Sequence, residues 1–156
     1  MTILTSNQLT SQQLADLRAL VAACKAADDS VPNLYFYILE LPRTLPASAL
    51  YYQNNQLIGF LSVYFFYEDA VEAALLIHPS HRRKSVAKAL LEQMRMLLEI
   101  NHTHKLIFTT AAGKNGHWLE QKGFRYQHSE YHMVRDDLNP LLNHTPNASF
   151  RDAKPQ

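Results

Sequence analysis

Residues 75–87 read LLIHPSHRRKSVA and contain residue types that bind anions. An apolar stretch leads into a turn with Pro79, three consecutive cations follow at residues 82–84, and a helical pattern then begins. The first turn of a helix has unpaired backbone N–H groups and carries the positive end of the helix dipole. A cationic turn in front of such a helix therefore predicts a cradle for a phosphate or pyrophosphate group, which the small Ser85 would let approach the backbone closely.

Two other interpretations of the three cations stay open. A charged run on a loop is often only a solvated turn that binds nothing. A contact with nucleic acid is the second alternative, but 15 Lys and Arg against 14 Asp and Glu leave a net charge of only +1. Because a nucleic-acid surface must neutralise many phosphates, this balance predicts that nucleic acid is not a partner.

The cradle needs a strand before it and a helix after it, and the sequence supplies both. Residues 70–77 are apolar except for Glu72 and end at His78-Pro79, which is typical of a buried strand. Over residues 85–101, apolar side chains recur at helical spacing on one face, with charged side chains mostly opposite. Residues 85–101 therefore show the clearest helical pattern of the chain.

The remaining sequence alternates helical and strand patterns. Thr10 and Gln13 have the spacing of a capping box, and Asn54-Asn55 tolerates the positive φ of a two-residue hairpin turn. The predicted helices are one over 10–27, a short one among the loops of 28–48, and a short one over 115–122 that Gly123 ends. The predicted strands are a hairpin pair over 50–53 and 56–67, a strand over 105–110, and final strands over 124–126 and 131–134.

These patterns predict one mixed α/β domain with its longest helix packed on a sheet. The domain is expected over residues 1–138, since 156 residues, 47% of them hydrophobic, suffice for one core but not two. Residues 139–156 contain three prolines and few apolar anchors, which predicts an extended or disordered tail. The lone Cys24 cannot form an internal disulfide, and no apolar run is long enough to cross a membrane, so we expect a cytoplasmic protein.

The cationic segment also resembles the acyl-CoA-binding motif of the GNAT superfamily of N-acetyltransferases. That motif reads Arg or Gln, two residues, Gly, one residue, then Gly or Ala. Arg82 occupies its first position and Ala87 its last, while Ser85 stands where the family prefers Gly. The resemblance extends in element order over about residues 10–135. It implies a mixed, mostly antiparallel central sheet flanked by helices, and transfer of an acetyl group from acetyl-CoA to a primary amine of a small molecule or peptide.

Carried onto this sequence, the resemblance implies that backbone groups near Leu76 and Ile77 pair with the pantetheine arm of acetyl-CoA. The pyrophosphate would lie on the turn formed by Arg82, Arg83, Lys84, Ser85, Val86 and Ala87. Transfer in this family is usually a direct attack by the amine, which needs a base for the ammonium proton and donors for the developing charge.

Glu72 is the candidate base, because it is the only acid in its strand and the family often places a glutamate there. The alternative is that its side chain points to solvent. Many family members carry a tyrosine on the short helix as the acid, at the position that Leu119 occupies here. Tyr131 on the last predicted strand is the candidate substitute, with His117 and Tyr126 also nearby in sequence, although an aromatic side chain there can equally pack on the sheet.

The aromatic runs at residues 35–37 and 64–67 would suit an acceptor with apolar or aromatic character. No metal is predicted, because His102 and His104 lie close together without a carboxylate or thiol at ligand spacing. The family often forms dimers, which makes a homodimer a candidate state. An alternative function is a GNAT-fold module that regulates or interacts, with Ser85 and Leu119 as signs of lost chemistry.

Overall fold

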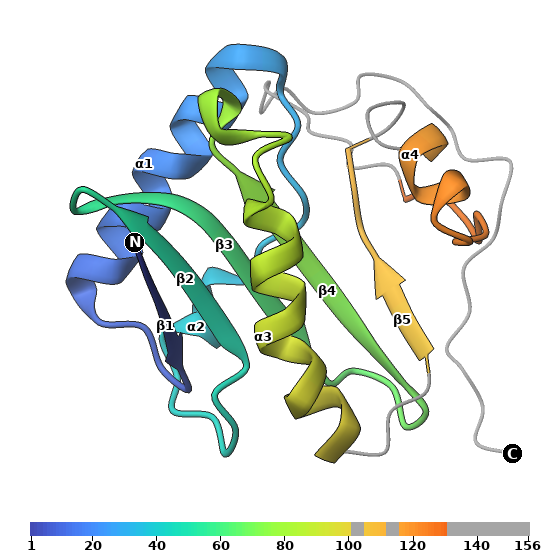
Figure 1. Cartoon of the computed structure of the whole chain (residues 1–156). Helices are drawn as coiled ribbons and strands as arrows, with labels where there is room; N and C mark the ends of the chain where they lie inside the picture. Colours follow the sequence, from blue (N-terminus) through green and yellow to red (C-terminus); the bar gives the residue numbers. More distant parts are fainter. Residues whose placement is uncertain (101–104, 112–115, 131–156) are drawn as a thin grey trace, which may run out of the picture. The chain divides into compact units, whose positions relative to one another are not determined.

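The computed structural model describes residues 1–100, 105–111 and 116–130. The chain divides into two compact units, Met1–Tyr126 and Gln127–Gln156, and the elements below belong to the first. In chain order they are β1 (Thr2–Ser6), α1 (Ser11–Asp28), α2 (Phe36–Leu39), β2 (Ser48–Gln53), β3 (Gln56–Tyr64), β4 (Ala70–Ile77), a 3-10 turn (Pro79–His81), α3 (Val86–Ile100), β5 (Lys105–Phe108) and α4 (Gly116–Gln121) (Figure 1).

The five strands form one sheet in the order β1-β2-β3-β4-β5. Every neighbouring pair is antiparallel except β4 and β5, which are parallel and are joined by α3. A parallel pair requires such a crossover connection, and a helix is its usual form. The predicted mixed, mostly antiparallel sheet is therefore confirmed.

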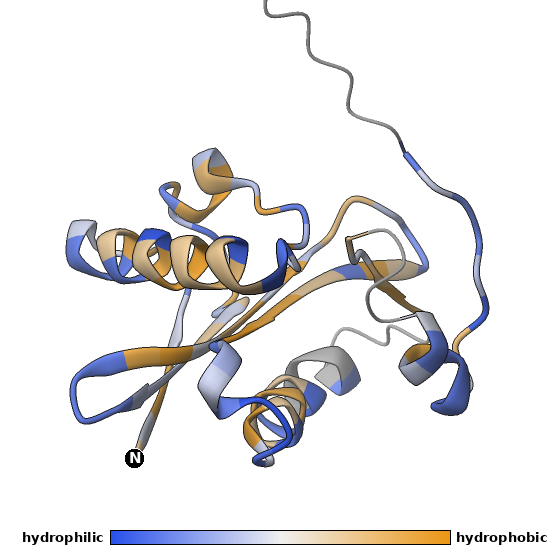
Figure 2. Cartoon of the chain, turned by 90° about the horizontal axis from the view of Figure 1, so that it is seen from above, coloured by the Kyte–Doolittle hydropathy of each residue, from blue (hydrophilic) through white to orange (hydrophobic). Residues whose placement is uncertain are grey.

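Helices cover both faces of this sheet, and two apolar clusters result. Along β3, Phe60 and Tyr64 pack in the cluster with α1 and α2, whereas Leu61 and Val63 pack with α3. This alternation follows from the two-residue period of a strand. In Figure 2 the hydrophobic sides of the helices face the sheet from its two sides. The α1 side of the core contains Leu14, Leu17, Leu20 and Cys24, all of them buried.

Two local predictions are confirmed at the atomic level. The Thr10 hydroxyl accepts a hydrogen bond from the Gln13 backbone N–H at 3.2 Å, and the Gln13 side chain accepts one from the Thr10 N–H at 2.9 Å, so the capping box is complete. In the β2–β3 hairpin, Asn54 and Asn55 have φ angles of 49° and 62°. The capping box sets where α1 begins, and the asparagine turn joins β2 to β3.

The structure differs from the sequence-based expectation at two places. The edge strand β1 was not expected, because its five residues show no run of apolar side chains. Residues 124–126 form no strand, because the Phe124 N–H donates to the Leu119 carbonyl at 3.1 Å and so belongs to the cap of α4, where Gly123 has a φ of 86°. The predicted strand over 131–134 and the domain boundary after residue 138 lie outside the described residues.

Gly59 lets α3 lie close to β3. A Cβ atom at this position would be 2.7 Å from Cγ1 of Val86 and 3.0 Å from Cδ1 of Leu90. Both neighbours are buried side chains in the first two turns of α3. The absence of a side chain at residue 59 therefore sets how closely the start of this helix approaches the sheet.

Substituting Gly59→Ala should lower the free energy of unfolding by about 1–3 kcal/mol, because the new methyl group must displace a packed side chain. Urea unfolding measures the change. Gly116→Ala is the matched control, since a Cβ there has no atom within 4 Å and should change stability little. Equal stability of the Gly59→Ala variant and the native chain would contradict the packing described for α3.

Candidate functional site

The C-terminal half of β4 forms an edge of the sheet. Residues 70–73 of β4 pair with residues 105–108 of β5, whereas residues 74–77 pair only with β3 among the described parts of the chain. This half of the strand leads directly into the cationic turn, where the end of α1 and the start of α3 also lie (Figure 1). A ligand with amide groups can pair with such an edge as an extra strand.

The register shows which backbone groups face this edge. The His78 N–H donates to the Ile58 carbonyl of β3 at 2.8 Å. Because backbone groups alternate direction along a strand, those of Leu76 also point to β3, and those of Leu75 and Ile77 point to the edge. The Ile77 carbonyl already accepts hydrogen bonds from Arg82 Nε at 3.2 Å and from the Cys24 thiol at 3.4 Å. The Ile77 N–H and both backbone groups of Leu75 therefore face the edge.

The cationic turn has a left-handed backbone at two non-glycine residues. Arg83 has a φ of 61° and Ser85 a φ of 62°, and α3 begins at the next residue, Val86. Ser85 thus has the conformation for which glycine is favoured, at the position where the resembled motif has glycine. Successive N–H groups in turns of this kind form concave anion-binding sites, and Arg83, Lys84 and Ser85 are all exposed.

The three consecutive cations play different structural roles. Arg82 binds Asp28 at the end of α1 through Nη1 and Nη2, at 2.6 and 3.2 Å, and Ser30 Oγ through Nη2 at 2.7 Å. Arg83 and Lys84 form no ion pair or side-chain hydrogen bond within the part of the chain that the structure describes. The Arg82 side chain therefore holds the turn against α1, and the charges of Arg83 and Lys84 stay available for a ligand.

This contact also changes the chemistry of the groups around it. The hydrogen bond from Arg82, together with one from Ser30, holds the pKa of the Asp28 carboxyl well below its ordinary value. Cys24 is fully buried in the α1 core, and burial raises the pKa of its thiol. A buried thiol with a raised pKa is a packing group and not a nucleophile, as expected from its helical position.

The variant Asp28→Asn should be less stable than the native chain at about pH 7, by roughly 1 kcal/mol for a pair whose side chains are 34% and 35% exposed. A carboxyl whose pKa is lowered by folding stabilises the fold above its unfolded pKa of about 4, and this contribution is lost as the pH falls through the folded value. The stability difference should therefore shrink below about pH 4, as measured by urea unfolding across pH.

Asp29→Asn is the control for this measurement, since the side chain of Asp29 has no hydrogen bond or ion pair among the described residues. Its difference from the native chain should not change with pH in the same range. A stability gap for Asp28→Asn that is constant down to about pH 3 would contradict the role of the Arg82 contact.

Glu72 is buried on the face of the sheet covered by α1 and α2. Only 5% of the residue is exposed, so the alternative that its side chain points to solvent is wrong. Its cross-strand partner is Tyr64 on β3, and the Tyr35 hydroxyl donates a hydrogen bond to Glu72 Oε1 at 3.2 Å. A buried carboxylate next to the open half of β4 has the placement that a proton acceptor for this edge requires.

Tyr35 and Tyr64 adjoin this carboxylate, and two more aromatic side chains contact the Tyr35 ring. We call the four the aromatic patch: Tyr35, Tyr37, Tyr64 and Phe66. The Tyr35 ring is edge-on to Tyr64 and Phe66, with centroids 4.8 and 5.0 Å apart, and Tyr64 and Phe66 stack at 5.5 Å. Tyr37 is edge-on to Tyr35 at 6.2 Å. Burial raises the pKa of Tyr64, which keeps its hydroxyl protonated at neutral pH.

The last role to place is that of the proton-donating acid. Tyr131, the predicted acid, lies outside the described residues. Leu119 does lie on α4, where its carbonyl accepts the Lys122 N–H, and a leucine side chain has no proton to give. Of the other candidates, Tyr126 is 73% exposed, and His117 pairs with Gln121 on its own helix at 2.9 Å.

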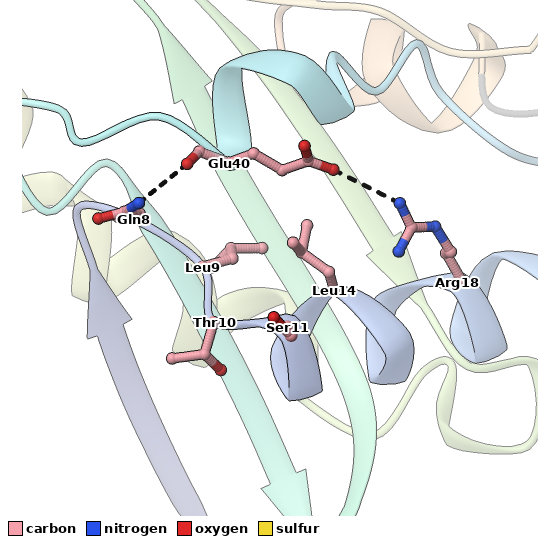
Figure 3. A pocket seen from close by; sticks show the side chains of 7 residues that line it. All are labelled: Gln8, Leu9, Thr10, Ser11, Leu14, Arg18 and Glu40. Atoms are coloured by element: carbon pink, nitrogen blue, oxygen red, sulfur yellow. Dashed lines mark hydrogen bonds and ion pairs between the residues drawn. The ribbon is translucent and has the colours of Figure 1, made fainter.

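A shallow surface hollow of about 680 Å³ lies outside the turn and the β4 edge, between the start of α1 and the end of α2. An ion pair of 3.5 Å between Arg18 and Glu40 crosses it (Figure 3). None of its lining residues is a candidate for catalysis or cofactor binding.

Within residues 1–100, 105–111 and 116–130, no three His, Cys, Asp or Glu side chains gather as a metal site would require.

Sequence reasoning missed two partners of the site. Asp28 was assigned to the start of a loop, whereas it is the last residue of α1 and pairs with Arg82. Tyr35 was assigned to an acceptor region without a role for its hydroxyl, which in fact binds Glu72. Both contacts join residues more than thirty positions apart, and nothing in local spacing pairs them.

One protein family matches the part of the chain that contains the β4 edge and the cationic turn. A family described as "Acetyltransferase (GNAT) domain" matches residues 34–126, which is more than half of the chain. Comparison with curated proteins found no match.

Several solved structures share the fold. Ribosomal-protein-alanine N-acetyltransferase from Brucella melitensis has 21% identity and a TM-score of 0.55, covering 86% of this chain and 99% of that one. A soil-metagenome aminoglycoside acetyltransferase in complex with trehalose has 12% identity and a TM-score of 0.54, covering 86% and 96%. N-acetylglutamate synthase from Neisseria gonorrhoeae, complexed with coenzyme A and N-acetyl-glutamate, has 13% identity and a TM-score of 0.56, covering 78% and 28%. At these identities the likeness concerns the fold alone.

Proposed function

The chain belongs to the GNAT family of acetyltransferases, and from that premise we propose that it transfers an acetyl group from acetyl-CoA to a primary amine of a small molecule or peptide. The observation that carries the proposal is the open half of β4, which has a buried carboxylate beside it and runs into a turn where Arg83 and Lys84 are exposed and have no ion pair among the described residues. The related synthase from Neisseria gonorrhoeae was solved with coenzyme A, which supports the choice of donor.

The residues of the turn fit a pyrophosphate. Arg83 and Ser85 have a left-handed backbone, and successive N–H groups of such a turn would line a concave anion site, to which α3 adds the positive end of its dipole. Arg83 and Lys84 lie there without partners within the described residues and would balance the negative charge. Val86 and Ala87 form the first turn of α3 and contribute backbone N–H groups.

The edge of β4 fits the amide-containing pantetheine arm. We assign the pairing to the backbone of Leu75 and to the N–H of Ile77, since the backbone groups of Leu76 point to β3. Arg82 is a positioning residue in this scheme, because its guanidinium binds Asp28, Ser30 and the Ile77 carbonyl. It thereby fixes the junction between strand edge and turn.

Glu72 acts as the base. Acetyl-CoA supplies the acetyl group as an activated thioester, and the acceptor must lose the proton of its ammonium group before its nitrogen can attack. Glu72 takes that proton, and burial excludes bulk water from the carboxylate. The hydrogen bond from Tyr35 fixes the orientation of the carboxylate on the α1 face.

Tyr131 remains our candidate for the acid that protonates the leaving thiolate. Its role rests on its place on the last predicted strand, from which an inward-facing side chain could reach the cleft, and on the lack of a proton donor at Leu119. The cytoplasmic location, the homodimer and the lack of a nucleic-acid partner also remain predictions from the sequence. No helix within the described ranges is both long and apolar enough to cross a membrane.

The proposal is tested by incubating the full chain with acetyl-CoA and a panel of primary amines. Release of free thiol should depend on the amine, and mass spectrometry should find the N-acetylated amine as the product. If acetyl-CoA binds but no amine is acetylated, the chain is a CoA-binding module, which is the alternative that Leu119 suggests. If acetyl-CoA does not bind either, the proposed donor is wrong.

A further inference from the structure

Part of the aromatic patch is open to solvent and has no role in holding the turn or orienting the base. Phe66 is 47% exposed and Tyr37 is 65% exposed, whereas Tyr64 beneath them is buried. Both exposed rings contact the ring of Tyr35, so they belong to one cluster of aromatic side chains, and a contiguous exposed apolar surface is a candidate for binding another group. The question is which group this surface binds.

Two contacts tie the exposed rings to the carboxylate. Tyr35 donates its hydroxyl to Glu72 and places its ring edge against Phe66. Tyr64 pairs with Glu72 across the strands and stacks on the same phenylalanine, with ring planes 3° apart. Phe66 is therefore one ring removed from Glu72 along both contacts.

The chemistry of this arrangement is that of a site for an amphipathic cation. The buried carboxylate attracts an ammonium group, and the exposed Phe66 ring, separated from the carboxylate by one ring, offers a flat apolar surface. An acceptor with its amine at Glu72 and an aromatic group on a short linker would cover Phe66 and remove apolar surface from water. An aliphatic amine of similar size would leave most of the ring exposed.

We propose that Phe66 is a specificity-determining residue, and that the preferred acceptors are primary amines joined by a short chain to an aromatic or other flat apolar group. This inference rests on the proposed acetyl transfer, since it names the acceptor class of the same site. Phe66 acts by contact with the apolar part of the acceptor and takes no part in proton transfer.

The experiment compares phenylethylamine with butylamine, two primary amines of which only the first has a ring. The native chain should acetylate phenylethylamine with a kcat/KM about 10-fold higher, as expected when an apolar group fills a matching surface. Phe66→Ala should bring the two values together. Tyr67→Ala is the matched control, because Tyr67 is a neighbouring aromatic residue, 49% exposed, without a ring contact among the described residues, and should keep the preference.

The outcomes separate the acceptor inference from the proposed function. Acetylation of both amines with equal kcat/KM, or a preference that survives Phe66→Ala, overturns the inference and leaves acetyl transfer intact. If neither amine is acetylated, calorimetry of each amine with the protein decides. If phenylethylamine binds more tightly than butylamine and Phe66→Ala removes the difference, the role of Phe66 in acceptor binding is supported and the proposed acetyl transfer is not. Equal or absent binding of the two amines overturns the inference.

Discussion

Replacing Glu72 by glutamine should lower kcat/KM for the amine by about 10²- to 10⁴-fold, the range over which a positioned proton acceptor contributes to a reaction. Glutamine has the same shape and still accepts the hydrogen bond from Tyr35, but it cannot take a proton from the ammonium group. The affinity for acetyl-CoA should change little, because the turn lies at the other end of β4. Initial rates of thiol release and calorimetric titration with acetyl-CoA measure the two quantities.

The control for this variant is Glu68→Gln. Glu68 is exposed in the turn before β4, and the described part of the chain gives its side chain no hydrogen bond or ion pair. Its removal should leave the rate within about twofold, the effect expected for a surface charge outside the site. A Glu72→Gln variant that folds, binds acetyl-CoA and keeps the native rate would contradict the assignment of the base.

The second large effect is expected at Ser85. Ser85→Asp places a carboxylate among the amides that would hold the pyrophosphate, and repulsion between these charges should raise the Kd for acetyl-CoA by roughly 10- to 100-fold. Aspartate tolerates the left-handed backbone at this position, so the variant should fold. Calorimetry at moderate salt measures the Kd.

Two substitutions at the same residue separate charge from backbone strain. Ser85→Asn matches aspartate in shape without its charge and should bind acetyl-CoA nearly as well as the native chain. Ser85→Gly relieves the strain of a φ of 62° and should keep or improve binding. Equal losses for the aspartate and asparagine variants would show that the Ser85 side chain, and not the charge of the turn, determines affinity.

The sequence predicted the parts of the fold that depend on local pattern. The apolar period of α1, its capping box and the asparagine turn between β2 and β3 are properties of adjacent residues, and all are confirmed. The strand β4 and the helix α3 were also predicted almost to the residue. They fix the place of the cationic turn, so the location of the candidate cofactor site follows from the sequence.

What could not be predicted depends on contacts between distant segments. A run of three cations does not reveal which of them is paired, and the structure shows that Arg82 is occupied by Asp28 from the end of α1. The burial of Glu72 depends on the segment around Tyr35 crossing this face of the sheet. The edge strand β1 is held by pairing with β2, and its own side chains carry little signal.

The contacts of Arg82 determine which variant best tests acetyl-CoA binding at the turn. An Arg82→Ala variant would lose the contact with Asp28 and loosen the turn, so a fall in acetyl-CoA affinity would not show that the side chain touches the ligand. The charge introduced by Ser85→Asp acts without removing a native side-chain contact among the described residues. Ser85→Asp is therefore the better test of whether the turn binds acetyl-CoA.

Thermal unfolding of the full chain with and without excess acetyl-CoA is the most direct test that this chain binds the acetyl donor on the β4 edge and the cationic turn. A ligand that binds only the folded state must raise the unfolding midpoint, and the rise should grow with ligand concentration. We predict a clear rise for the native chain and for Ser85→Gly, and a much smaller one for Ser85→Asp. An unchanged midpoint of the native chain at about millimolar acetyl-CoA would contradict the acetyltransferase proposal.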